Sequence, residues 1–261
     1  MSMLELEVNR SAQTANGEKK YSLGIILSML FSRVALFILF QLLLYAVFRI
    51  GKIPSPWGLS ASFWPLNVAA ANLVCVFLLH RLLKREGKSF RDFFEYRKGE
   101  FGKLFLTMSA VMLLSFPIVY LPIVVLGNVL FGNQTDAVNL LYRPLPVWAA
   151  WVQCIAFPLT MPLGELTVYY GYVMPRLEVI TKKKWLSFAL PALILSFQHV
   201  ALPLLFDVRF MVWRLFMFLP FAVLLGLVVR WKPKLFPYIL IGHFFIDLMT
   251  AVSILTISLA A

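Results

Sequence analysis

Long apolar runs recur along almost the whole of this 261-residue chain. Each is roughly 20 residues long, the length that an α-helix needs to cross about 30 Å of hydrocarbon. Strands of a membrane barrel would be shorter and would alternate in polarity, so the runs indicate helices. Because 61% of the residues are hydrophobic and only 14% are charged, no single water-soluble core could bury them. The sequence therefore predicts an all-α, polytopic transmembrane helical bundle.

Seven of these runs are predicted to cross the membrane. All seven tryptophans fall near their ends, where an amphipathic ring favours the headgroup level. Residues 1–23 are predicted to form a polar cytoplasmic tail, and the first run is too long for a cleavable signal peptide. No polar stretch is long enough for a separate soluble domain, so we expect one bundle over residues 24–261. The predicted spans lie at about 24–49, 61–80, 104–128, 146–174, 186–206, 211–229 and 237–259.

The connecting segments alternate sharply in positive charge. If seven spans are correct, most of the 24 basic residues lie on one side of the membrane. The positive-inside rule then places the N-terminus in the cytoplasm and the C-terminus outside. The net charge of +12 is accordingly an orientation signal, and we expect a multi-pass protein of the cell membrane, surrounded by lipid, with no nucleic-acid partner. The basic-rich segments contain Arg10, Lys19 and Lys20; Arg81, Lys84, Arg85, Lys88, Arg91, Arg97, Lys98 and Lys103; Arg176 and Lys182 to Lys184; and Arg230, Lys232 and Lys234.

Four ionisable side chains, those of Glu165, His199, His243 and Asp247, fall inside the predicted spans. Charge at such depth is costly, and it marks sites that face a bundle interior or an aqueous pathway. Counted from the cytoplasmic ends at 1.5 Å per residue, the four lie roughly 15, 20, 9 and 15 Å deep. Since His243 and Asp247 are four positions apart, they share one helix face. We therefore expect the four side chains to meet in one polar site between three helices.

Each of these residues also has a purely structural interpretation. A buried glutamate can join two helices by a hydrogen bond, and a histidine four residues from an aspartate can simply neutralise it. Two arginines also fall in or near the spans. Arg214 lies near an outer end and is expected to extend to the interface, whereas Arg33 has no predicted partner.

Three short motifs contain the four residues in order along the chain. Glu165-Leu-Thr-Val-Tyr-Tyr-Gly resembles a signature that usually contains Glu-Glu-x-x-x-Arg, Leu-Ser-Phe-Gln-His199 resembles Phe-x-x-x-His, and His243-Phe-Phe-Ile-Asp247 resembles His-x-x-x-Asn/Asp. Together, over about residues 145–250, they resemble the CAAX protease and bacteriocin-processing (CPBP, or Abi) family of intramembrane endopeptidases. Leu166 stands where that family has its second glutamate, Tyr170 where it has its arginine, and Leu195 where it has the phenylalanine four residues before the histidine.

The resemblance implies a hydrolase with four catalytic residues. Glu165 would act as general base toward a water, and His199 would position that water or share its proton. His243 would stabilise the oxyanion, and Asp247 would either orient His243 or donate a hydrogen bond in its protonated form. The implied substrate is a membrane-associated peptide or protein, of which a prenylated tail is one example.

No cofactor is implied. Glu, His, His and Asp could together hold zinc, but no His-Glu-x-x-His helix is present, so we expect a metal-free mechanism. The alternative function is that of a catalytically inactive family member, acting as a membrane scaffold or a bacteriocin-immunity factor. A proton-coupled transporter is a third hypothesis, since buried carboxylates and histidines also form proton relays, although no inverted repeat is evident.

Overall fold

A computed structural model of the chain describes residues 21–94 and 99–261, so most of the predicted tail and part of the basic segment before residue 99 lie outside it. Within these ranges the chain is helical, and an isolated bridge between Ala201 and Leu204 is the one β-type pairing. The α-helices are α2 (Leu23–Ile50), α3 (Pro56–Ser62), α4 (Trp64–Arg85), α5 (Phe101–Phe131), α6 (Gln134–Leu141), α7 (Val147–Gly164), α8 (Met174–Thr181), α9 (Lys184–Phe197), α10 (Val208–Trp231) and α11 (Phe236–Ala260). Shorter helical turns are η2 (Phe90–Phe94), η3 (Thr167–Val173), η4 (Gln198–Val200) and η5 (Pro233–Leu235).

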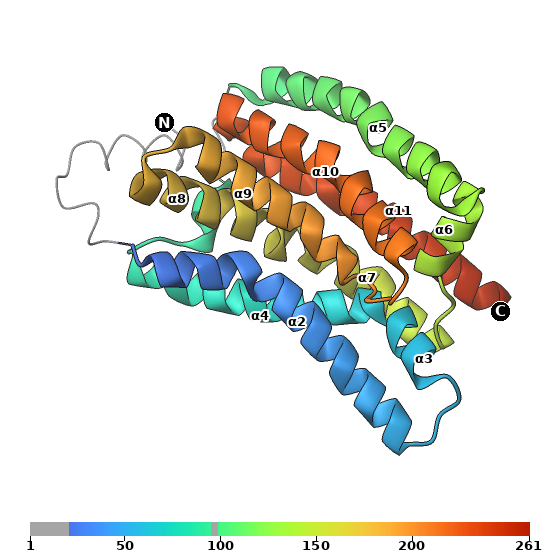
Figure 1. Cartoon of the computed structure of the whole chain (residues 1–261). Helices are drawn as coiled ribbons and strands as arrows, with labels where there is room; N and C mark the ends of the chain where they lie inside the picture. The colour runs from blue at the N-terminus through green and yellow to red at the C-terminus, as the bar shows by residue number, and fades with distance from the viewer. Residues whose placement is uncertain (1–20, 95–98) are drawn as a thin grey trace.

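The long helices pack side by side as one bundle (Figure 1). The helix α7 packs against both α4 and α11, and α10 packs against both α5 and α9. The first helix, α2, follows α4 and then diverges from it, while α5 forms the opposite edge (Figure 1). Six helical stretches in the described ranges are long and apolar enough to cross a membrane. The predicted all-α, polytopic bundle is confirmed.

Large apolar side chains are abundant on the outside of the bundle. Leu114, Val129 and Met249, for example, expose 67%, 75% and 73% of their surface. A water-soluble protein could not carry so many exposed apolar side chains without associating, but in a bilayer they meet lipid tails.

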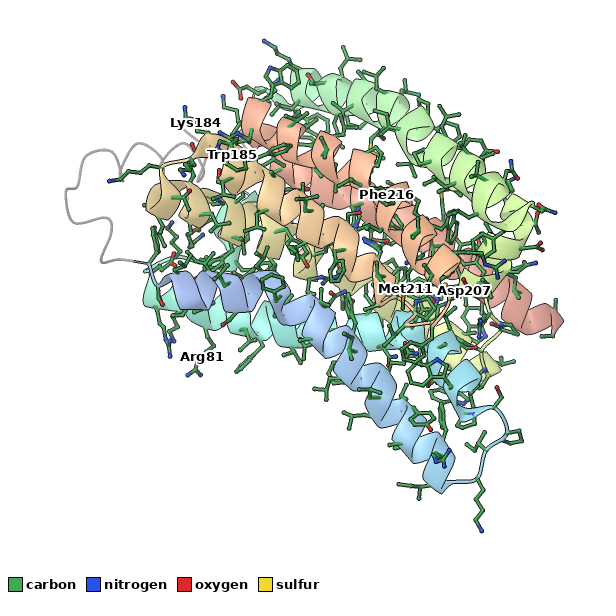
Figure 2. All side chains as sticks on the ribbon, in the orientation of Figure 1. Arg81, Lys184, Trp185, Asp207, Met211 and Phe216 are labelled. Atoms are coloured by element: carbon green, nitrogen blue, oxygen red, sulfur yellow. The ribbon has the colours of Figure 1, made fainter. Side chains whose placement is uncertain are left out.

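The prediction of one continuous helical span over residues 186–206 is wrong. The helix α9 has 14 residues, or about 21 Å of rise, and is followed by the turn η4 and by irregular chain up to Asp207. Pro203 disfavours a continuous helix across residues 198–206, because proline cannot donate a backbone hydrogen bond and disfavours a helical conformation in the residue before it. Figure 2 nevertheless labels Lys184 and Trp185 at one end of the bundle and Asp207 and Met211 at the other. Residues 184–207 thus extend from one end of the bundle to the other. The start of α2 and the end of α11 lie at opposite ends of the bundle (Figure 1).

The irregular chain after α9 is held by side chains from other helices. Gln41 of α2 donates to the carbonyl oxygen of Leu204 at 2.9 Å and accepts from its N–H, also at 2.9 Å. Arg214 of α10 donates through Nε to the carbonyl oxygen of His199 at 3.2 Å. Such pairing is required because backbone polar groups at membrane depth have no water to bind.

Arg214 therefore differs from the expectation that it extends to the outer interface. Only 2% of its surface is exposed, and its guanidinium lies over the ring of Phe218, 5.0 Å from the centroid. Trp213 beside it is likewise buried, and its indole N–H donates to the carbonyl oxygen of Ile123 in α5 at 3.1 Å. Near a span end, these two side chains join neighbouring segments of the bundle instead of meeting the headgroups.

We predict that replacing Gln41 by leucine will destabilise the bundle by about 2–4 kcal/mol, because the N–H and C=O of Leu204 would both lose their partner. The unfolding midpoint in detergent should fall, and hydrogen exchange should accelerate over residues 198–207. Gln134→Leu is the matched control, since the side chain of Gln134 makes no hydrogen bond within the described ranges. Equal midpoints for the two variants would contradict this role of Gln41.

Candidate functional site

Glu165 lies where the regular helix α7 ends. Pro158 and Pro162 remove two N–H donors from α7, and the chain continues after Glu165 as the π-helical turn η3. A π-helical turn widens the hydrogen-bonding pattern and is often found at functional sites. The Glu165 side chain is almost completely buried, at 1% exposure, and faces α2, α11 and the turn η4.

A close approach between α4 and α7 supports this position. A Cβ atom added to Gly164 would lie 2.6 Å from Oδ1 of Asn72, so only glycine leaves room for the Asn72 side chain there. Asn72 also donates to Oγ1 of Thr160 in α7 at 3.3 Å. The other polar atom of the Asn72 side chain, Oδ1, accepts a hydrogen bond from Nη1 of Arg33 in α2.

Arg33 of α2 forms an ion pair with Glu165. Its Nη2 lies 3.4 Å from Oε2 of Glu165, and its side chain is fully buried. The same Oε2 accepts a hydrogen bond from the amide of Gln198 in η4. Gln198 in turn accepts from Nε of Arg33 at 2.6 Å and from the hydroxyl of Tyr169 at 3.1 Å.

His243 lies between the two carboxylates of the site. Its Nε2 is 3.2 Å from Oε1 of Glu165 and 3.5 Å from Oδ2 of Asp247, on the same face of α11. Within the part of the chain that the structure describes, Nδ1 and Nε2 of His243 and Oδ2 of Asp247 have no hydrogen-bond partner although all three atoms are buried. These atoms are therefore available to bind a polar group that enters the site.

His199 is close to Glu165 but is oriented differently from the other candidates. Glu165 and His199 are near enough to interact electrostatically. The Nδ1 atom of His199 is 2.9 Å from the carbonyl oxygen of Leu195, which can only accept, so Nδ1 carries the proton and Nε2 has a free lone pair. The ring stacks on Phe218 at a centroid distance of 3.8 Å. No hydrogen bond joins His199 to Glu165, His243 or Asp247 in the described ranges.

The site forms a polar layer that divides the core of the bundle in two. Residues on one side of it, such as Leu30 and Leu240, belong to one buried apolar cluster, and residues on the other side, such as Phe37 and Ala251, belong to a second. The helices α2, α4 and α11 each cross from one cluster to the other at their polar residues. We call this the polar layer, and its members are Arg33, Asn72, Glu165, Gln198, His199, His243 and Asp247.

The structure thus brings Glu165, His243 and Asp247 into direct proximity, with His199 nearby. Sequence reasoning missed Arg33, Asn72 and Gln198. A lone arginine inside an otherwise apolar run was a usable signal, because a charge there needs a partner, although Glu165 and Asp247 were carboxylates at equal predicted depth. Where the family signature has an arginine, Tyr170 instead donates its hydroxyl to the carbonyl oxygen of Ala222.

A comparison with family descriptions, curated proteins and solved structures found no match to this chain. The family resemblance of the three motifs therefore stays a prediction. Among the described residues, no group of three or more His, Cys, Asp or Glu side chains is arranged to hold a metal ion.

We predict that Gly164→Ala will destabilise the protein by about 1–3 kcal/mol, because the new methyl group would displace Asn72 and so disturb Arg33. Thermal unfolding in detergent measures this loss. Gly102→Ala is the matched control, since a Cβ atom there meets nothing within 4 Å. A Gly164→Ala midpoint equal to or above that of Gly102→Ala would show that the close approach is not needed.

Proposed function

We propose that this protein is an intramembrane endopeptidase of the CPBP type, in which Glu165 activates a water to cleave a membrane-associated peptide or protein. The observation that carries the proposal is that Glu165, His243 and Asp247 lie together, and that three buried polar atoms of His243 and Asp247 make no hydrogen bond and can bind a ligand. A general base, a hydrogen-bond donor and a group that orients the donor are the parts that peptide hydrolysis needs.

In the proposed reaction, Oε1 of Glu165 takes a proton from water while the water oxygen attacks the scissile carbonyl carbon. His243, which lies 3.2 Å from Oε1, would donate a hydrogen bond to the oxyanion that forms on the carbonyl oxygen. Asp247, on the same helix face, would hold the imidazole in place. Collapse of the intermediate breaks the C–N bond, and the proton held by Glu165 passes to the departing amine.

His199 would take part from the opposite side of Glu165. With Nδ1 committed to Leu195, its Nε2 can accept a hydrogen bond from the attacking water and so help to orient it. Stacking on Phe218 fixes the plane of the ring. This role differs from that of His243, which lies between two carboxylates and is suited to donate.

The substrate class follows from the surroundings of the site. Every residue of the polar layer lies inside the bundle, between helices that are apolar on the outside, so a substrate must be a peptide segment at or in the bilayer. The cell membrane is the proposed location, in the orientation that the basic segments indicate. Arg81 and Lys184, from two of these segments, lie at the same end of the bundle (Figure 2).

A second candidate function is that of a catalytically inactive membrane scaffold or bacteriocin-immunity factor. The observation that favours it is that Oε2 of Glu165 is already engaged by Arg33 and Gln198. A carboxylate paired in this way can also serve only to hold helices together.

We predict that Glu165→Gln will lower cleavage by about 10²–10⁴-fold, because the variant loses its general base. The purified protein is reconstituted with a diverse pool of membrane-anchored peptides, and the products are identified by mass spectrometry with and without a chelator. Glu100→Gln is the control, since this carboxylate pairs with Lys234 at the edge of the bundle, 3.1 Å away. Cleavage should persist in Glu100→Gln and in the presence of chelator.

Two results would contradict the enzyme proposal. One is full cleavage by a folded Glu165→Gln variant, which would assign the activity to other residues or to a contaminant. The other is the absence of any product with folded wild-type protein, which would favour the scaffold or immunity function.

A further inference from the structure

We infer that Arg33 is a positioning residue. It holds Oε2 of Glu165 in place, so that Oε1 is the oxygen that takes part in the proposed reaction. The inference rests on the proposed function, but it also makes a claim about the charge and orientation of Glu165 that can be tested without a substrate. The inference gives α2, which lies outside the three motifs, a role in the site.

The guanidinium of Arg33 contacts three helical segments at once. Its Nε donates to Gln198, its Nη1 to Asn72, and its Nη2 lies 3.4 Å from Oε2 of Glu165. The carbon Cζ also lies over the ring of Phe37, 5.0 Å from its centroid. A planar guanidinium presents its donors in a fixed fork, so three partners in different directions hold it in one orientation.

This arrangement determines the orientation of the Gln198 amide. A guanidinium cannot accept a hydrogen bond, so the Gln198 atom that faces Nε of Arg33 must be the amide oxygen. The hydroxyl of Tyr169 donates to the same oxygen at 3.1 Å. The NH₂ group of Gln198 is thereby directed at Oε2 of Glu165 as a donor.

Two donors therefore point at Oε2 of Glu165, one charged and one neutral. A proton on Oε2 would be directed at both donors, so Oε1 is the oxygen better placed to take a proton from water. Oε1 is the oxygen that faces Nε2 of His243 at 3.2 Å, where the proposed reaction takes place. Arg33 and Gln198 thus act on the reaction through Glu165, without touching the reacting atoms.

Several titratable groups surround Glu165, and they differ in how their charge depends on pH. They are Tyr169 and Tyr170 from η3, His199 from η4, and His243 and Asp247 from α11. Arg33 from α2 is the cation that forms an ion pair with Glu165. Removing it should favour the protonated form of Glu165, because a buried carboxylate without a cation is strongly disfavoured.

The test compares Arg33→Gln and Arg33→Lys with a matched control, Arg176→Gln. Arg176 is also fully buried and also forms an ion pair with a glutamate, Glu86, but it lies outside the polar layer. Infrared difference spectra at pH 7 report the charge of Glu165, whose bands are identified by their loss when Glu165→Gln is added to each background. Turnover is measured on the peptide that wild-type protein cleaves best.

We predict that wild type and Arg176→Gln will show an ionised Glu165, whereas Arg33→Gln will show the carbonyl band of a protonated carboxyl group. Arg33→Lys should keep Glu165 ionised, because it keeps the cation. Its kcat should nevertheless fall by about 10²-fold with little change in KM, because an ammonium cannot orient Gln198, Asn72 and Glu165 together.

The outcomes separate the two proposals. An ionised Glu165 in Arg33→Gln, or wild-type kcat in Arg33→Lys, would overturn the role of Arg33. If Arg33→Gln does not fold, Arg33→Lys alone decides, since a variant that binds substrate normally and turns over slowly supports positioning. If the infrared bands shift as predicted while no protein cleaves any peptide, the charge-setting role of Arg33 stands and the proposed enzyme function fails.

Discussion

The ion pair between Arg33 and Glu165 is the contact on which the interior of this bundle depends. Either charge alone, at this depth and almost without exposure, would cost several kcal/mol. Together, and with Gln198 and Asn72 completing their hydrogen bonds, they can be buried. Because the four residues come from four different segments, satisfying one guanidinium fixes how α2, α4, α7 and η4 pack against one another.

The same requirement explains why irregular backbone is concentrated around the polar layer. A π-helical turn follows Glu165, and α9 ends just before Gln198 and His199. The interruptions place Glu165, Gln198 and His199 at or beyond the ends of regular helices, whereas the continuous helices α2, α4 and α11 supply the other members of the polar layer. The backbone groups released by the interruptions are bound by Gln41 and Arg214, so the cost of irregularity at membrane depth is offset by side chains.

Much of the fold could be predicted from the sequence, because an apolar chain segment can cross a bilayer only as a helix or as a strand of a closed barrel. The break after Phe197 was missed because the residues that follow it are as apolar as a helix, and only Pro203 marked the change. Within the site, the i, i+4 spacing of His243 and Asp247 and the matching depth of Glu165 predicted their proximity. Hydropathy could not identify the partner of Arg33 or predict that the Arg214 side chain points into the bundle. The partner of a buried cation depends on how the helices are rotated about their axes.

The shortness of α9 has a consequence for how the protein enters the membrane. A helix of 14 residues is shorter than the hydrocarbon layer, and the backbone beyond it is bound in part by side chains of other helices, Gln41 at Leu204 and Arg214 at His199. Such a segment cannot be stable in lipid by itself. Its placement must wait for α10, which is synthesised after it, and must also recruit α2, which is synthesised before it. The polar layer is consequently completed only when α2 and α11 have come together with the segments between them.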